Sequence, residues 1–258
     1  MSIEKVFDYK SDEIIRPQDV YDRIEDEIDN LPEVAVVTFK SEFIDVLKCR
    51  PDIEIVTDKL GIDSNDTNVY AVTHKNKRIA VYQTLVGGPG TVCRLENMIA
   101  WGMSKFVLFG GCGALDRDIA EGSFIIPTAA YRDEGTSYHY AEASDYIEIK
   151  TADKLSDIMT ELRLPHVKGK TWTTDAFFRE TKNNMQKRIA EGCLTVEMEC
   201  ASFIAAGQFR GVDVYQYLYA QDNLDATEWE MRSLGDGEAA LSVSEKYMLI
   251  ALDIAAMV

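Results

Sequence analysis

The strongest constraint in this sequence is the alternation of short apolar runs with segments of helical periodicity. Runs such as 105–111 and 213–220 are largely apolar, which is typical of strands covered on both faces. This order predicts an α/β fold in which a central, mixed and largely parallel β-sheet is flanked by helices. The expected strands are 34–39, 68–75, 78–86, 105–111, 123–131, 167–174, 194–199 and 213–220, and the expected helices are 40–49, 91–103, 152–163, 179–191, 200–210 and 238–257.

Two of these strands, 68–75 and 78–86, are joined through the short polar segment Lys75–Asn76–Lys77. So short a connection predicts a hairpin, and a hairpin makes the sheet mixed. No linker, repeat or low-complexity stretch divides the chain. We therefore expect one domain over 1–258, in which 1–33 is an N-terminal segment.

Composition excludes several classes of protein. The formal net charge of −17 on 258 residues opposes binding to nucleic acid, which is itself a polyanion. No apolar run reaches about 18 residues, so no membrane span is expected. The N-terminus lacks the layout of a secretory signal. The five cysteines have no CxxC spacing, which is best explained by reduced thiols in a cytoplasmic protein and gives no support for a zinc site.

Glycine-rich segments follow two of the expected strands, where ligands bind in open α/β sheets. The first, VGGPGT at 86–91, includes Gly87 and Gly88 and leads into a helix whose N–H groups can hold an anion. The second, FGGCGAL at 109–115, includes Gly110 and Gly111 and lets a ligand lie against bare backbone. A tight turn or close packing against a helix would require the same glycines.

Two further strand ends carry polar and aromatic side chains. In TTDAFF (173–178), Phe177 could stack on a planar ring beside Thr174, although paired aromatics are more often part of a core. Asp222 follows a strongly apolar strand and is a candidate general acid. An N-cap for a helix beginning near Ala226 is an equally good interpretation of Asp222.

A fifth feature is the pair of acids in LTVEME (194–199). Glu197 and Glu199 interrupt an apolar run, and a carboxylate in a dry interior is costly without a partner. Period-two alternation offers a simpler explanation, a half-buried strand with one wet face.

Taken in order, GGPGT, FGGCGAL, RDEGTSYH (132–139), TTDAFF, VEMEC and the strand end at Asp222 resemble the purine nucleoside and uridine phosphorylase family, over roughly residues 34–222. The resemblance implies that Glu199 binds the ribose hydroxyls and that Met198 packs against the sugar. It places Glu197 near the same site. A buried Glu199 would then be stabilised by charge-assisted hydrogen bonds from the sugar.

The same resemblance implies the roles at the base. Phe177, with Thr174 beside it, would lie against the base, and Asp222 would give a proton to N7 of a purine. Arg232 would support that acid. Uridine-cleaving members hold uracil with a Gln and an Arg at positions that are Thr181 and Asn183 here, so a purine nucleoside is the expected substrate.

The nucleophile is inorganic phosphate in the phosphorylases and water in the nucleosidases of the same superfamily. Of the family's phosphate-binding arginines, one position is Leu108, and the loop 38–43 has none. Lys40 and Arg94, with amides of the glycine segments, are the candidate replacements, although a lone Arg more often lies on a solvated helix face. Glu42 could instead orient a water molecule.

Three functions therefore follow from the resemblance. The first is phosphorolysis of nucleosides to free base and ribose 1-phosphate, with phosphate as co-substrate and no cofactor or metal. The second is hydrolysis on the same scaffold, and the third is nucleoside binding without catalysis. Family members are dimers or hexamers whose active sites a neighbour completes, so a homo-oligomer is expected, with Phe7, Tyr9 or His139 as contributions across the interface.

Overall fold

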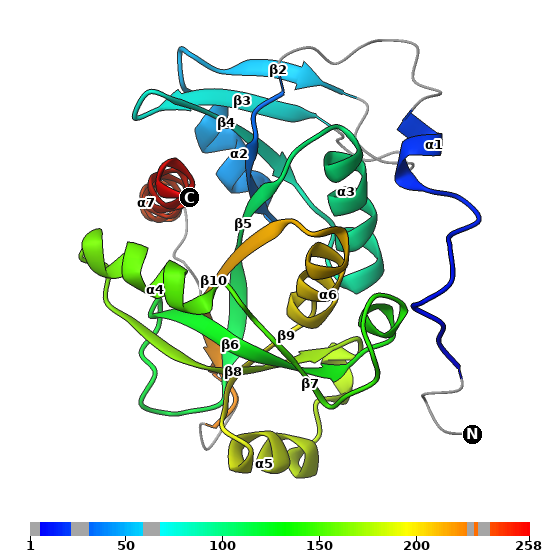
Figure 1. Ribbon diagram of the computed structural model, residues 1–258. Coiled ribbons are helices and arrows are strands. Elements are labelled where there is room, and N and C mark those ends of the chain that lie inside the picture. The colour runs from blue at the N-terminus through cyan, green and yellow to red at the C-terminus, as the bar shows by residue number, and fades with distance from the viewer. Residues whose placement is uncertain (1–5, 22–30, 59–67, 226–229, 232–237) are drawn as a thin grey trace.

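The computed structural model describes residues 6–21, 31–58, 68–225, 230–231 and 238–258. Strands and helices alternate along the chain around a large central sheet (Figure 1). The strands are β1 (Val34–Thr38), β2 (Glu54–Thr57), β3 (Val69–His74), β4 (Lys77–Gln83), β5 (Lys105–Ala114), β6 (Phe124–Asp133), β7 (Tyr146–Glu148), β8 (His166–Thr174), β9 (Cys193–Glu197), β10 (Asp213–Asn223) and β11 (Glu230–Met231). The helices are α1 (Pro17–Tyr21), α2 (Ser41–Lys48), α3 (Gly88–Ala100), α4 (Ala152–Glu161), α5 (Lys182–Ala190), α6 (Cys200–Arg210) and α7 (Glu238–Met257), with 3-10 turns η2 (Thr136–His139) and η3 (Phe177–Arg179).

Every strand and helix expected from the sequence is present, with its ends shifted by only a few residues, and the α/β class is confirmed. The elements that sequence patterns missed are short: α1, β2, β7 and β11. Three or four residues at the edge of a sheet do not establish a period, so their sequences carry no clear signal.

The expected hairpin is confirmed. β3 and β4 pair antiparallel from Val69 opposite Tyr82 to His74 opposite Lys77. The turn residues Lys75 and Asn76 have φ values of 48° and 62°. Two consecutive left-handed residues are typical of the tight hairpin turn whose twist matches that of the flanking strands.

The sheet is mixed, with parallel pairs at its centre. β1 pairs parallel with β4 and β5, and β5 pairs parallel with β10. A feature not foreseen from the sequence is that β5 also pairs with β9, so that β5, β10, β6, β8 and β9 form a closed ring of paired strands. Ring closure places β9 and β10 on opposite sides of the glycine-rich end of β5.

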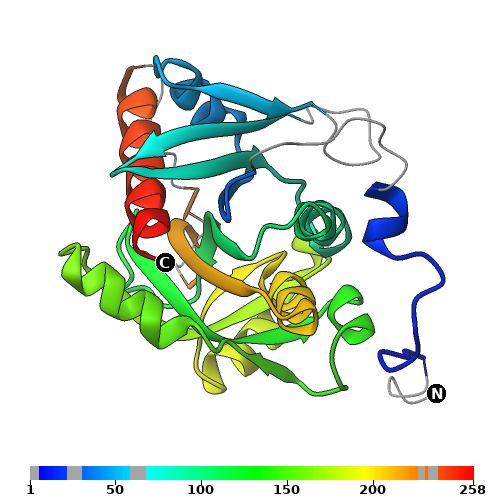
Figure 2. The same cartoon turned by 45° about the horizontal axis from the view of Figure 1, so that its top comes forward.

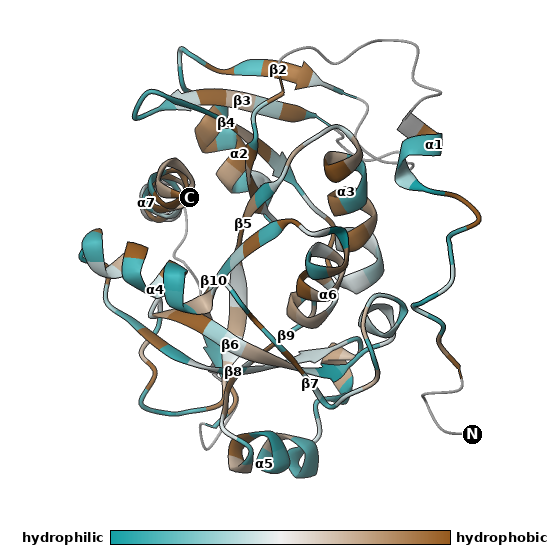
Figure 3. Cartoon of the chain, in the orientation of Figure 1, coloured by the Kyte–Doolittle hydropathy of each residue, from teal (hydrophilic) through white to brown (hydrophobic). Residues whose placement is uncertain are grey.

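Helices cover both faces of the sheet. α2, α4 and α7 lie on one side, and α3 and α6 pack together on the other (Figures 1 and 2). α6 is buried from Cys200 to Gly207, whereas α5 is largely hydrophilic at the periphery (Figure 3). None of the helices in the described ranges combines the length and apolar character needed to cross a lipid bilayer.

Candidate active site

A cavity of about 500 Å³ opens where the expected strand ends meet. Its lining comes from segments far apart in the sequence, including the ends of β1, β5 and β10 and the residues after β8 and β9. The predicted site residues that line it are Lys40, Gly110, Gly111, Phe177, Glu197, Met198, Glu199 and Asp222. The structure therefore brings together the proposed sugar-binding and base-binding side chains.

The glycine-rich end of β5 explains this convergence. Gly113 pairs with Val196 of β9 on one side and with Asp222 of β10 on the other. A Cβ atom at Gly113 would collide with Leu224 and lie 3.3 Å from Oδ1 of Asp222, and one at Gly111 would collide with the Gln221 amide oxygen. Side chains of Gln221, Asp222 and Leu224, at and just after the end of β10, therefore pack directly on this backbone.

An irregularity in β10 immediately precedes Asp222, whose side chain lines the cavity. The pairing of β10 with β5 shifts register between Ala220 and Asp222, so Gln221 is an extra residue in the strand. Such a bulge bends the strand and redirects the side chains that follow it. Asp222 still belongs to β10, which runs to Asn223, and a helix N-cap role would involve residues 226–229, outside the described residues.

Glu199 lies at the start of α6 and is only 7% exposed. Its Oε1 accepts a hydrogen bond of 2.6 Å from the backbone N–H of Gly87, at the N-cap of α3. Burial and the neighbouring Glu197 raise the pKa of Glu199 to about 8, and the Gly87 hydrogen bond opposes that rise. A buried carboxyl with a raised pKa requires further hydrogen-bond donors to stabilise its ionised form.

This raised pKa makes a prediction about stability. Between pH values of about 4.5 and 8, the folded protein retains a proton on Glu199 that the unfolded chain releases, so the stability contributed by this group falls as the pH rises. Glu199→Gln carries no such proton. We expect the variant to gain about 3–4 kcal/mol relative to the native chain between pH 5 and pH 8, because each pH unit between the two pKa values is worth about 1.4 kcal/mol. Urea unfolding at both pH values measures the free energy of unfolding of each protein. A difference between variant and native chain that is the same at pH 5 and pH 8 would contradict the prediction. Glu161→Gln, at an exposed position in α4, is the control.

Glu197 is held by the protein itself. Its Oε2 accepts hydrogen bonds from the backbone N–H groups of Glu199 (2.8 Å) and Cys200 (2.6 Å), and its Oε1 accepts one from the Thr173 hydroxyl (2.6 Å). Burial raises the pKa of Glu197, and these hydrogen bonds oppose the rise. The side chain therefore joins the end of β8 to the start of α6 and sets the position of Glu199.

Lys40 follows β1 and is the only cationic side chain among the described residues that line the cavity. Its Nζ donates a hydrogen bond of 3.4 Å to the Gln221 side chain and lies 5.8 Å from the centre of the Tyr219 ring. Burial lowers the pKa of Lys40. An anion beside Lys40 would offset that desolvation.

Comparisons with known proteins agree with this geometry. The family model described as the phosphorylase superfamily matches residues 34–249. The chain belongs to the phosphorylase superfamily.

Among curated relatives of this superfamily member are DeoD-type purine nucleoside phosphorylases. Those of Bacillus cereus (strain ZK / E33L) and Bacillus thuringiensis (strain Al Hakam) are each 29% identical over 160 residues, 59% of this chain. The matched region spans 66% of the length of these relatives, slightly less than two thirds.

Solved structures show the same fold. A purine nucleoside phosphorylase from Toxoplasma gondii in complex with immucillin-H has a TM-score of 0.71 and 17% identity, covering 89% of this chain and 92% of its own. A uridine phosphorylase from Vibrio fischeri ES114 has a TM-score of 0.72 and 19% identity, covering 90% and 95%.

Other predicted site residues of this phosphorylase-superfamily chain lie outside the cavity lining. Gly87 and Gly88 begin α3, where Gly87 holds Glu199 and a Cβ at Gly88 would collide with Ser202. Thr174 is buried, and its hydroxyl accepts a hydrogen bond from the Ala176 N–H.

The expectation for Arg94 needs correction. Arg94 lies neither at the cavity nor on a solvated helix face: it is 2% exposed and donates from Nη1 to the carbonyl of Gln83, because α3 packs this side chain against the end of β4. Glu42 is exposed in the first turn of α2 and is not among the lining residues, although its negative charge acts on Lys40, so its role in orienting a water molecule stays a prediction. Arg232 lies outside the described residues.

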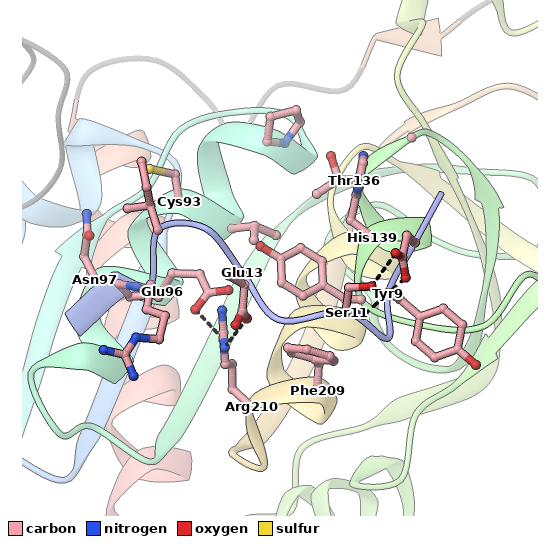
Figure 4. Close-up of a pocket in the computed structure, with 18 of the residues that line it drawn as sticks. Tyr9, Ser11, Glu13, Cys93, Glu96, Asn97, Thr136, His139, Phe209 and Arg210 are labelled. Atoms are coloured by element: carbon pink, nitrogen blue, oxygen red, sulfur yellow. Dashed lines mark hydrogen bonds and ion pairs between the residues drawn. The ribbon is translucent and has the colours of Figure 1, made fainter. Parts of the chain in front are cut away.

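A larger hollow of about 940 Å³ lies under the N-terminal segment, beside α3, η2 and α6 (Figure 4). Arg210 pairs there with Glu13 and Glu96 at 2.7 Å each, which ties the segment to α6. Phe7 stacks on Tyr138 and contacts the His139 ring within its own chain. The expectation that this segment takes part in a subunit interface stays a prediction.

Sequence reasoning missed one acidic residue of the cavity. Glu180 follows η3 and lines the cavity with Phe177 and Asp222. A carboxyl three residues after an aromatic base-binding candidate is the signal that could have found it. Among the described residues, no group of His, Cys, Asp and Glu side chains is arranged to hold a metal ion.

Proposed function

We propose that this chain cleaves the N-glycosidic bond of purine nucleosides. The observation that supports the proposal most directly is that Glu199 and Asp222 line one cavity from opposite sides of β5. A nucleoside has hydroxyl groups at one end and a basic heterocycle at the other. Two separated acids suit such a molecule, because one can accept hydrogen bonds from the sugar while the other protonates the base.

The reaction assigns a role to each of these side chains. Glu199 accepts hydrogen bonds from the ribose hydroxyls, and Met198 packs against the sugar. Phe177, which is 47% exposed at the cavity mouth, stacks on the base. Asp222 gives its proton to N7 as the C1′–N9 bond breaks, so the base leaves as a neutral molecule and C1′ acquires oxocarbenium character.

The preference for purines rests on what lies at the base end. An acid such as Asp222 assists a purine, whose N7 accepts a proton. Thr181 is the N-cap of α5 and Asn183 lies in its first turn, and neither is among the residues that line the cavity. The positions that the family uses to hold uracil therefore offer no substitute for its Gln and Arg.

Phosphate is the nucleophile in this proposal, and the product is ribose 1-phosphate. Lys40, which lies beside Gln221 and Tyr219, supplies one positive charge, and the backbone of Gly110 and Gly111 supplies a surface without side chains. A doubly charged anion requires such donors to replace its lost hydration.

Hydrolysis is the second candidate function, and the charge of the cavity favours it. Four carboxyl side chains, Glu180, Glu197, Glu199 and Asp222, line the cavity, against one cation in the described lining. Those of the four carboxyls that are ionised repel the phosphate anion and do not repel neutral water.

One assay tests the proposal and separates the two nucleophiles. The release of free base is measured from inosine, adenosine, guanosine and uridine, with and without phosphate. We expect release from the purine nucleosides to require phosphate and uridine to be inert. Release that is equal without phosphate would replace phosphorolysis by hydrolysis, and tight nucleoside binding without release would make the chain a binding protein.

A further inference from the structure

The base end of the cavity contains a second carboxyl group that the proposed chemistry does not use. Glu180 directly follows the short η3 turn that begins at Phe177, and both residues line the cavity together with Asp222. Among the described residues, none donates a hydrogen bond to the Glu180 side chain or pairs with it as a cation. In the open cavity water can solvate this carboxyl, and a ligand that displaces the water would have to supply a hydrogen-bond partner instead.

Four other charged side chains in the described part of the chain line the cavity with Glu180. Asp222 on β10 is the charged neighbour that acts on Glu180 most directly, Glu197 and Glu199 lie at the end of β9, and Lys40 follows β1. Burial and the negative charge of Asp222 raise the pKa of Glu180 to about 7. Both forms of the side chain are therefore populated near neutral pH.

The geometry of a purine connects these two acids. N7 and the substituent at C6 are neighbours on the same edge of the base. A base whose N7 faces Asp222, and whose ring lies on Phe177, presents its C6 substituent to the same end of the cavity. Resting on the proposed function, we infer that Glu180 recognises the C6 substituent of the purine and selects between 6-amino and 6-oxo bases.

The two forms of Glu180 select opposite substrates. The carboxylate only accepts hydrogen bonds, so it pairs with the 6-amino group of adenosine and is repelled by the 6-oxo group of inosine. The protonated acid can donate to the 6-oxo group. A rise in pH through 7 therefore shifts the preference towards adenosine, and a fall shifts it towards inosine.

The test compares two substrates on the same enzyme. The ratio of kcat/KM for adenosine to kcat/KM for inosine is measured between pH 6 and pH 8 in the native chain, in Glu180→Gln and in the control Glu161→Gln. We expect the ratio to rise about tenfold in the native chain and in the control, the effect of one hydrogen bond to a charged group. The glutamine, which does not titrate, should make the ratio nearly independent of pH.

Because each ratio comes from a single enzyme sample, the fraction of active protein cancels. A ratio that varies with pH in Glu180→Gln as it does in the native chain would overturn the inference, and so would a constant ratio in the native chain. In both cases cleavage of the nucleosides leaves the proposed function standing. A native chain that cleaves neither nucleoside removes the proposed function, and this inference with it.

Discussion

Asp222→Asn is expected to lower kcat for purine nucleosides by about two to four orders of magnitude, the usual contribution of a positioned proton donor. Asparagine has nearly the same shape as aspartate, so the pairing of β10 with Gly113 should persist while the transferable proton is lost. Steady-state release of hypoxanthine from inosine measures the effect.

A matched control lies three residues further along the chain. Asp225 pairs with the exposed Arg117 at 3.2 Å and is not among the residues lining the cavity, so Asp225→Asn should leave kcat nearly unchanged. A second substrate isolates the acid role: a p-nitrophenyl riboside, whose leaving group departs without protonation, should lose little rate in Asp222→Asn. Near-native turnover of inosine by this variant would remove the role of general acid.

Glu199→Ala is expected to lower kcat/KM for inosine by about 10²–10³. The variant loses two hydrogen bonds to a charged group, each worth about 1.5–3 kcal/mol, of which desolvation of the carboxylate offsets a part. It also leaves the N–H of Gly87 without its present acceptor. Steady-state kinetics with inosine give the loss directly.

A comparison of sugars separates this role from a purely structural one. The native chain should prefer inosine to 2′-deoxyinosine, which lacks one hydroxyl, and that preference should largely disappear in Glu199→Ala. Glu148→Ala, exposed on β7, is the control and should retain it. If the variant loses activity but keeps the native preference between the two sugars, Glu199 does not bind the ribose.

The sequence predicts the fold well because the signals are local. Long apolar runs and helical periods identified the larger elements, and Lys75 and Asn76 marked the hairpin. Glycines 110 and 111 were also found, because a strand that ends in glycines is unusual whatever it packs against. These features depend on a few consecutive residues.

The remainder depends on contacts between distant segments. Nothing near β5 in the sequence indicates that it pairs with both β9 and β10, or that α3 turns Arg94 inwards to the carbonyl of Gln83. In the sequence Glu180 looks like an ordinary loop residue, and its pKa is raised only by burial in the folded chain and by the neighbouring charge of Asp222. Such properties belong to the assembled chain.

The pairing of Gly113 with both β9 and β10 also sets a length scale for ligands. Neighbouring strands are about 4.8 Å apart, so Val196, which precedes Glu199 by three residues, and Asp222 lie about 10 Å apart across Gly113. Hydrogen-bonded ladders fix this spacing, and no hinge has to close to create it. If the two acids act as proposed, a free base or a free pentose would reach only one of them, whereas a molecule in which base and pentose are joined would reach both.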